Sequence, residues 1–149
     1  MYLEEDTNLT IHLAQDSSSF DVDRLVFLLM ELDKVHNQAS PEKFPLFAME
    51  KRREDILKIL DQGYLFYAKI HNQIVAFASV LKKKDALIIE YLFVLPEYRH
   101  KKIGTKLVKN IFAKFPNQEI FVSVYAFNEE AIKFYEPLFA LSSLVFKKK

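Results

Sequence analysis

Between residues 86 and 125, the hydrophobic pattern changes from that of a strand to that of a helix and back again. Ala86–Leu95 is a nearly continuous apolar run, Gly104–Phe115 has apolar residues at helical spacing, and Glu119–Tyr125 is a second strand-like run. A strand, a helix and a strand in this order predict two parallel strands joined by a right-handed crossover. The segment therefore predicts an α/β fold.

Other hydrophobic runs predict the remaining elements. Their order favours an α/β domain around a mixed sheet whose early strands are antiparallel. With 149 residues, half of them hydrophobic, the chain suits a single domain over residues 1–149 with one core. The predicted elements are a strand over 11–14, helices over 22–37 and 49–60, strands over 64–70 and 74–81 with a turn at 71–73, a helix over 128–136 and a last strand over Leu141–Phe146.

The amino-acid composition excludes several classes of protein. The absence of cysteine excludes a disulfide framework, catalysis by a protein thiolate and cysteine-based metal sites. The formal net charge of +1 indicates no strongly acidic or basic partner. The first ten residues, MYLEEDTNLT, lack the basic and apolar regions of a secretory signal. No apolar run reaches the roughly 20 residues that span a bilayer, so we expect a cytoplasmic protein without a membrane partner.

A cationic loop follows the first of the two parallel strands. It reads Arg99-His100-Lys101-Lys102-Ile103-Gly104-Thr105 and leads into the predicted helix. Free amides at a helix N-terminus, the positive end of the helix dipole and several cations would together bind a diphosphate. A solvated basic face is the alternative reading, because lysines on a helix usually serve solubility. The position directly after a buried strand favours the binding site.

Glu90 is a lone carboxylate within the apolar run Ile88–Phe93. A carboxylate there must be paired, exposed in a cleft or raised in pKa. A general base benefits from such a setting. The alternative is a structural carboxylate that forms a salt bridge to a neighbouring strand or occupies an exposed edge.

The segment Asn128–Tyr135, NEEAIKFY, predicts a short helix with chemistry at its end. Asn128 is a favourable N-cap, and Glu129 and Glu130 suit the first turn. The phenol of Tyr135 can donate a proton or a hydrogen bond. Taken alone, the segment indicates only a well-capped helix.

Together these segments resemble the GNAT-type N-acetyltransferase family. The pattern is Glu90-x-Leu92-x-Val94-x-Pro96-x-Tyr98-Arg99-x-x-x-Ile103-Gly104 followed by Asn128-x-x-Ala131-Ile132-x-Phe134-Tyr135. The resemblance is strong over roughly Ala86 to Pro137, and the order of elements extends it to nearly the whole chain. The resemblance implies a mixed, mostly antiparallel sheet with helices on both faces and a splayed parallel strand pair that holds the cofactor.

The resemblance also implies an activity. Such an enzyme transfers the acetyl group of acetyl-CoA to a primary amine, of a small molecule or a protein, by direct attack in a ternary complex and without a metal. Glu90 matches the general base, and Tyr135 matches the acid that protonates the departing thiolate. Residues implied to bind the cofactor are Phe93 and Val94 through their backbone groups, Arg99, His100, Lys101, Lys102, Ile103, Gly104 and Thr105 around the diphosphate, and Asn128 beside the pantetheine arm.

The chain departs from the family pattern in two places. Lys102 occupies the position of the first loop glycine, so we expect a stiffer loop that still binds phosphate. Phe139-Ala140 replaces a glycine-phenylalanine pair after the last helix, which is expected to alter the final turn.

Other readings of the chain remain open. A non-catalytic acyl-CoA-binding or regulatory module on the same fold is one, and a nucleic-acid binder is a weaker one because the net charge is nearly neutral. His36 either orients an acceptor or places a charge at a helix C-terminus, the reading that we favour. Tyr125 and Phe127 either wall the acceptor site or belong to the core. The resemblance to the family also leads us to expect a homodimer.

Overall fold

The structure is a computed structural model that describes residues 8–149. Its centre is one five-stranded sheet in the order β1-β2-β3-β4-β5. The first four strands are antiparallel neighbours, whereas β4 and β5 run parallel. The mixed, mostly antiparallel sheet expected from the sequence is confirmed. The strands are β1 (Leu9–Leu13), β2 (Gly63–Ile70), β3 (Gln73–Lys82), β4 (Ala86–Val94) and β5 (Glu119–Val122).

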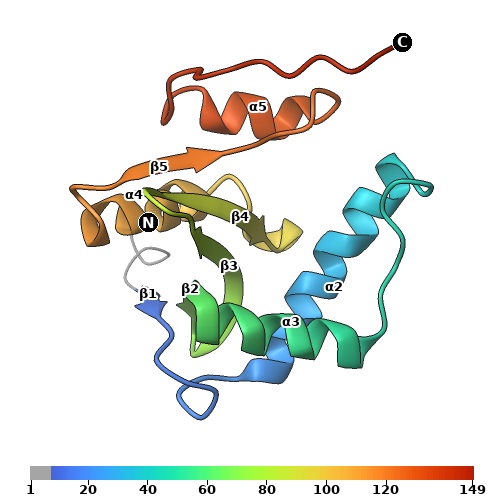
Figure 1. Ribbon diagram of the computed structural model, residues 1–149. Helices are drawn as coiled ribbons and strands as arrows, with labels where there is room; N and C mark the ends of the chain where they lie inside the picture. The colour runs from blue at the N-terminus through green and yellow to red at the C-terminus, as the bar shows by residue number, and fades with distance from the viewer. Residues whose placement is uncertain (1–7) are drawn as a thin grey trace.

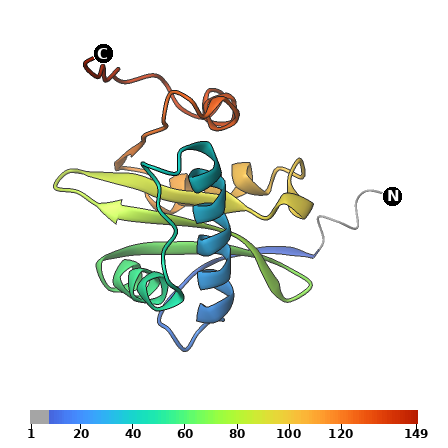
Figure 2. The ribbon, with the colours of Figure 1, turned by 90° about the vertical axis from the view of Figure 1, so that its right-hand side faces the viewer.

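Helices cover both faces of the sheet, as expected. The apolar faces of α2 (Val22–Ala39) and α3 (Met49–Gln62) pack on one face, and that of α4 (Ile103–Lys114) packs on the other (Figure 2). The short helix α5 (Glu129–Tyr135) lies along β5, on the side away from α3 (Figure 1). No helix within residues 8–149 combines the length and the hydrophobicity needed to cross a membrane.

Local sequence signals set the ends of these elements. Asp21 caps α2, because its side chain accepts a hydrogen bond of 3.0 Å from the backbone N–H of Arg24. The β2–β3 hairpin turns through His71 and Asn72 at φ angles of 51° and 64°. Positive φ at both central residues is the geometry of a type I′ turn, which matches the twist of the strands.

Strand β4 has two irregularities that shape the molecule. Its parallel pairing with β5 covers only the four pairs from Ala86–Glu119 to Ile89–Val122. On the β3 side, the register shifts between Ser79 and Val80, so Glu90 is left without a partner. Beyond Ile89 the two parallel strands diverge, as Figure 1 shows. This is the splayed pair that the sequence predicts.

The prediction of a last strand over Leu141–Phe146 was wrong. The segment forms no strand and follows α5 as an irregular chain (Figure 1). Its apolar side chains are exposed, with Val145 at 94% and Phe146 at 87%. Strand propensity alone does not form a strand, because a strand needs a neighbour that accepts its backbone hydrogen bonds. For the same reason β5 ends at Val122, before the predicted end at Tyr125.

Candidate functional site

Glu90 stands on the wall of a hollow beside the point where β4 and β5 separate. The hollow has a volume of ≈ 570 Å³ and lies between α3 and strands β3 and β4. Glu90 is exposed there, yet its pKa is raised above 4.5, first by partial desolvation and second by the nearby Asp55 carboxylate. Arg52, Lys83 and Lys58 act in the opposite direction. Glu90 is therefore accessible and more basic than an ordinary surface carboxylate.

At the end of β4, one backbone carbonyl points toward the splayed region and does not bond to β3. The N–H of Leu95 donates to Val75 of β3 at 3.0 Å. Because the N–H and C=O of one peptide point in opposite directions, the carbonyl of Val94 points away from β3. Arg99 Nε donates to this carbonyl at 3.0 Å, and the Arg99 guanidinium lies 5.5 Å from the centre of the Phe93 ring. Arg99 also reaches Glu130 of α5, at 3.8 Å.

The cationic loop leads into the first turn of α4, whose backbone amides have no side-chain cap. The chain turns from Arg99 through His100 and Lys102, whose φ angles are 63° and 64°. Lys102 is the N-cap of α4, and no side chain caps this helix end. The first amides of α4 therefore face the loop without a capping partner, at the positive end of the helix dipole.

Lys102 occupies the left-handed region that glycine tolerates best, and we expect Lys102→Gly to stabilise the protein. The left-handed conformation costs a residue with a Cβ roughly 1–2 kcal/mol, and the greater freedom of unfolded glycine offsets part of the gain. The free energy of unfolding in urea should rise by about 1 kcal/mol. Lys101→Gly removes the same charge where φ is not positive, so it should give no increase. Equal effects of the two substitutions would contradict the account.

Gly104 is the point where three elements of the site meet. A Cβ built on Gly104 would lie 3.1 Å from the ring of Phe134 on α5 and 3.8 Å from Val94 on β4. The missing side chain lets the first turn of α4 approach both neighbours. Gly104 thus allows α5, which ends with Tyr135, to lie close to the end of β4.

We expect Gly104→Ala to destabilise the protein, although alanine favours a helix. The added methyl group must displace the Phe134 ring, and overpacking of this kind costs about 1–3 kcal/mol against a gain of about 1 kcal/mol in helix propensity. The net loss in the urea-derived free energy of unfolding should be about 1 kcal/mol. The double variant Gly104→Ala/Phe134→Leu should recover most of this loss. A single variant as stable as the parent would show that Phe134 moves freely.

Asn128 precedes helix α5 and Tyr135 is its last residue, and both were singled out from the sequence. Asn128 accepts a hydrogen bond of 3.1 Å from the N–H of Ala131, which confirms it as the N-cap. Tyr135 packs between Phe134 and Phe139, with ring centres 5.0 and 5.6 Å away. Burial raises the pKa of Tyr135 to about 12. The phenol therefore keeps its proton across the neutral range and remains a potential donor.

A comparison with known protein families finds a match over a longer part of the chain than these motifs. The model of the "Acetyltransferase (GNAT) family" matches residues 29–138, which is more than half of the chain. The chain belongs to the GNAT acetyltransferase family. No curated protein matches it significantly in sequence.

Solved structures share the GNAT fold with this chain at low sequence identity. The aminoglycoside N-acetyltransferase AAC(6')-Iy in complex with CoA is 16% identical, with a TM-score of 0.70, and the match covers 95% of this chain and 94% of that one. The ribosomal-protein-alanine N-acetyltransferase of Brucella melitensis is also 16% identical, with a TM-score of 0.66 and coverage of 95% and 99%. An aminoglycoside acetyltransferase from an uncultured soil sample, in complex with sisomicin, is 21% identical, with a TM-score of 0.66 and coverage of 97% for both.

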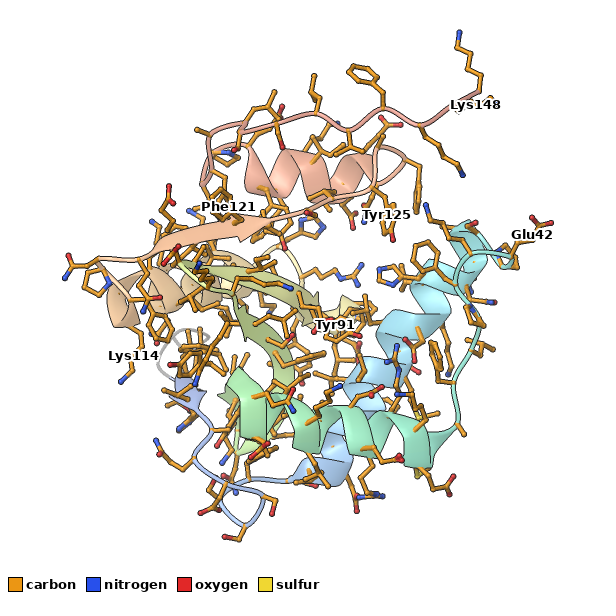
Figure 3. The ribbon with its side chains drawn as sticks, viewed as in Figure 1. Glu42, Tyr91, Lys114, Phe121, Tyr125 and Lys148 are labelled. Atoms are coloured by element: carbon orange, nitrogen blue, oxygen red, sulfur yellow. The ribbon has the colours of Figure 1, made fainter. Side chains whose placement is uncertain are left out.

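Aromatic side chains of this GNAT domain join the segment after β5 to the loop between α2 and α3. The ring of Phe44 lies 5.0 Å from Tyr125 and 6.3 Å from Phe127, and these two rings stack at 5.5 Å. Figure 3 shows Tyr125 facing this loop. His36 lies 5.1 Å from Phe44, and burial lowers its pKa. His36 lies in the last turn of α2, as the favoured reading requires, but its lowered pKa reduces the fraction of the imidazole that is charged near pH 7.

A buried ion pair that was not predicted from the sequence lies beside the hollow. Arg52 of α3 binds both carboxylate oxygens of Asp33 on α2, at 2.8 and 2.5 Å, and also donates to Asp55 at 2.8 Å. Its guanidinium lies 4.2 Å from the Phe47 ring and 5.8 Å from Tyr91, which lies on the α3 side of β4 (Figure 3). A signal was available, since both charged residues fall on the apolar faces of amphipathic helices.

Proposed function

We propose that this protein transfers the acetyl group of acetyl-CoA to a primary amine. The observation that carries the proposal is the arrangement at the end of β4: a carboxylate in an accessible hollow, a splayed parallel pair and a helix N-terminus without a cap. Membership of the GNAT family and the CoA held by a structure of the same fold support it.

The residues around the splayed pair fit the chemistry of CoA. The open amides of Ile103, Gly104 and Thr105, together with the cations of the preceding loop, suit a diphosphate. The carbonyl of Val94, which points away from β3, suits an amide of the pantetheine arm, provided that the Arg99 guanidinium moves off it. Asn128 uses its side-chain oxygen to cap α5 and retains its Nδ2 donor. Phe93, His100, Lys101 and Lys102 complete the proposed cofactor site.

Glu90 is the proposed general base. An alkylammonium has a pKa near 10, so it must lose a proton before its nitrogen can attack a carbonyl. Glu90 accepts that proton, directly or through water, and the amine nitrogen bonds to the acetyl carbon of the thioester. The carbon–sulfur bond breaks, CoA leaves as a thiolate, and the nitrogen releases its second proton to water, which later returns a proton to Tyr135. Tyr135 then supplies the proton that turns the thiolate into the thiol.

We expect Tyr135→Phe to lower turnover and to leave the affinity for acetyl-CoA unchanged. The thiolate is a good leaving group, so the loss should be moderate, roughly tenfold to a hundredfold in kcat. Steady-state kinetics with varied acetyl-CoA would separate kcat from KM. Full activity of the variant would show that water supplies the proton instead.

A thermal shift with acetyl-CoA tests the cofactor part of the proposal. A ligand that binds only the folded state must stabilise it, by about 2.7 kcal/mol at a hundred times its dissociation constant. We expect millimolar acetyl-CoA to raise the melting temperature by several degrees. No shift at this concentration would refute the cofactor assignment.

A further inference from the structure

The walls of the hollow beside Glu90 are predominantly cationic. Five cationic and two carboxylate side chains line it, and Phe47, Ile59 and Leu81 are among its other lining residues. Its volume of ≈ 570 Å³ is in the range of small-molecule sites. The cationic lining residues are Lys51, Arg52, Lys58, Lys82 and Lys83, and the carboxylates are Asp55 and Glu90.

Several of these charges already have partners. Lys51 binds Asp55 at 2.7 Å, and Arg52 binds Asp33 and Asp55. Lys82 lies over the Tyr64 ring at 4.9 Å. The Asp55 carboxylate is therefore engaged by two cations, which leaves Glu90 as the carboxylate that faces the hollow.

Lys58 of α3 and Lys83 of the β3–β4 turn differ from the other cations. Neither forms an ion pair within 4.0 Å or lies over an aromatic ring among residues 8–149. Both lie close enough to Glu90 to favour its ionised form. The hollow thus offers one carboxylate for an ammonium group and, beside it, two cations that no ion pair within the described part of the chain engages.

We infer that the acceptor is a small primary amine that also carries an anionic group, such as a carboxylate, a few bonds from its nitrogen. The amine meets Glu90, and the anionic group binds Lys58 and Lys83. A simple alkylamine or a diamine would leave these lysines without a partner, and a diamine would add a second cation to a wall that is already positive. This inference rests on the proposed function, because it describes the second substrate of the same site.

Calorimetric titration of amines into the protein of residues 1–149, with and without CoA, tests the inference without any chemical step. The matched pairs are glycine with methylamine, β-alanine with ethylamine and 4-aminobutanoate with propylamine. 2-Aminoethyl phosphate separates phosphate from carboxylate as the anionic group, and 1,3-diaminopropane represents dicationic acceptors. We expect at least one anionic amine to bind roughly tenfold tighter than its matched alkylamine.

Two variants and a control locate the effect. Lys58→Gln and Lys83→Gln should each remove most of that roughly tenfold preference, whereas Lys34→Gln, on the exposed face of α2, should retain it. Equal or tighter binding of the alkylamines or the diamine would overturn the inference, and so would an unchanged preference in both variants or no binding of any amine.

Thiol release from acetyl-CoA with the same amines distinguishes this inference from the proposed function. Acetylation of alkylamines and diamines in preference to the anionic amines would overturn the inference and leave the proposed function intact. Selective binding of anionic amines without thiol release would refute the proposed activity and support the charge preference of the hollow.

Discussion

Glu90→Gln is expected to lower turnover about 10²- to 10⁴-fold, the usual contribution of a positioned general base. Glutamine keeps the size and the hydrogen-bonding capacity of the side chain but cannot accept the proton. The affinity for acetyl-CoA should not change, because Glu90 lies on the wall of the hollow, away from the loop and the helix end assigned to the diphosphate. Steady-state kinetics would show the loss in kcat with the KM for acetyl-CoA unaltered.

The pH profile makes this prediction specific. Glu90 acts as a base only when ionised, and its pKa is raised above 4.5. The rate of the parent protein should therefore rise with pH through this raised pKa and level off above it. Glu90→Gln should lack this acidic limb, whereas Glu54→Gln on the exposed face of α3 should retain it. An identical profile in parent and Glu90→Gln would remove Glu90 as the base.

Arg52→Met is expected to lower the free energy of unfolding by about 3–5 kcal/mol. The substitution leaves the carboxylate of Asp33 buried between α2 and α3 without its bidentate partner. Burial alone would lower the pKa of Arg52, but hydrogen bonds from its guanidinium to Asp33 and Asp55 outweigh that effect and raise it. Urea unfolding followed by circular dichroism would measure the loss.

Two further variants keep this prediction testable if Arg52→Met does not fold. Arg53→Met removes the neighbouring arginine, whose ion pair with Asp23 is exposed, and should cost less than about 1 kcal/mol. The double variant Arg52→Met/Asp33→Leu removes both buried charges and should recover most of the stability. A double variant as unstable as Arg52→Met would show that the unpaired Asp33 is not the cause of the loss.

Hydrophobic periodicity and turn residues predict most of this fold, because most of its helices and strands are determined by the residues within each element. The helices over 22–37, 49–60 and 104–115 are observed with ends shifted by one or two residues. The last strand failed for a non-local reason, since no strand pairs with Leu141–Phe146. The early end of β5 has the same origin, because β4 turns away from it beyond Ile89.

The site could be predicted only in part. The structure places Glu90 in a hollow, Asn128 as the cap of α5 and the cationic loop at the start of α4, and their roles in binding and catalysis stay predictions. The charge of the hollow could not be predicted, since Lys58 and Lys83 lie on separate elements and meet only through the packing of α3 against the sheet. The carbonyl of Val94 and its contact with Arg99 depend on the direction of one peptide plane, which the sequence does not specify.

Release of free CoA from acetyl-CoA, measured with a thiol reagent across a panel of primary amines, tests the central claim most directly. We expect release that depends on the amine, with stoichiometric formation of the N-acetylated product and a loss of about 10²-fold or more in Glu90→Gln. Stabilisation by acetyl-CoA without release for any amine would contradict the account and would indicate a non-catalytic acyl-CoA-binding module.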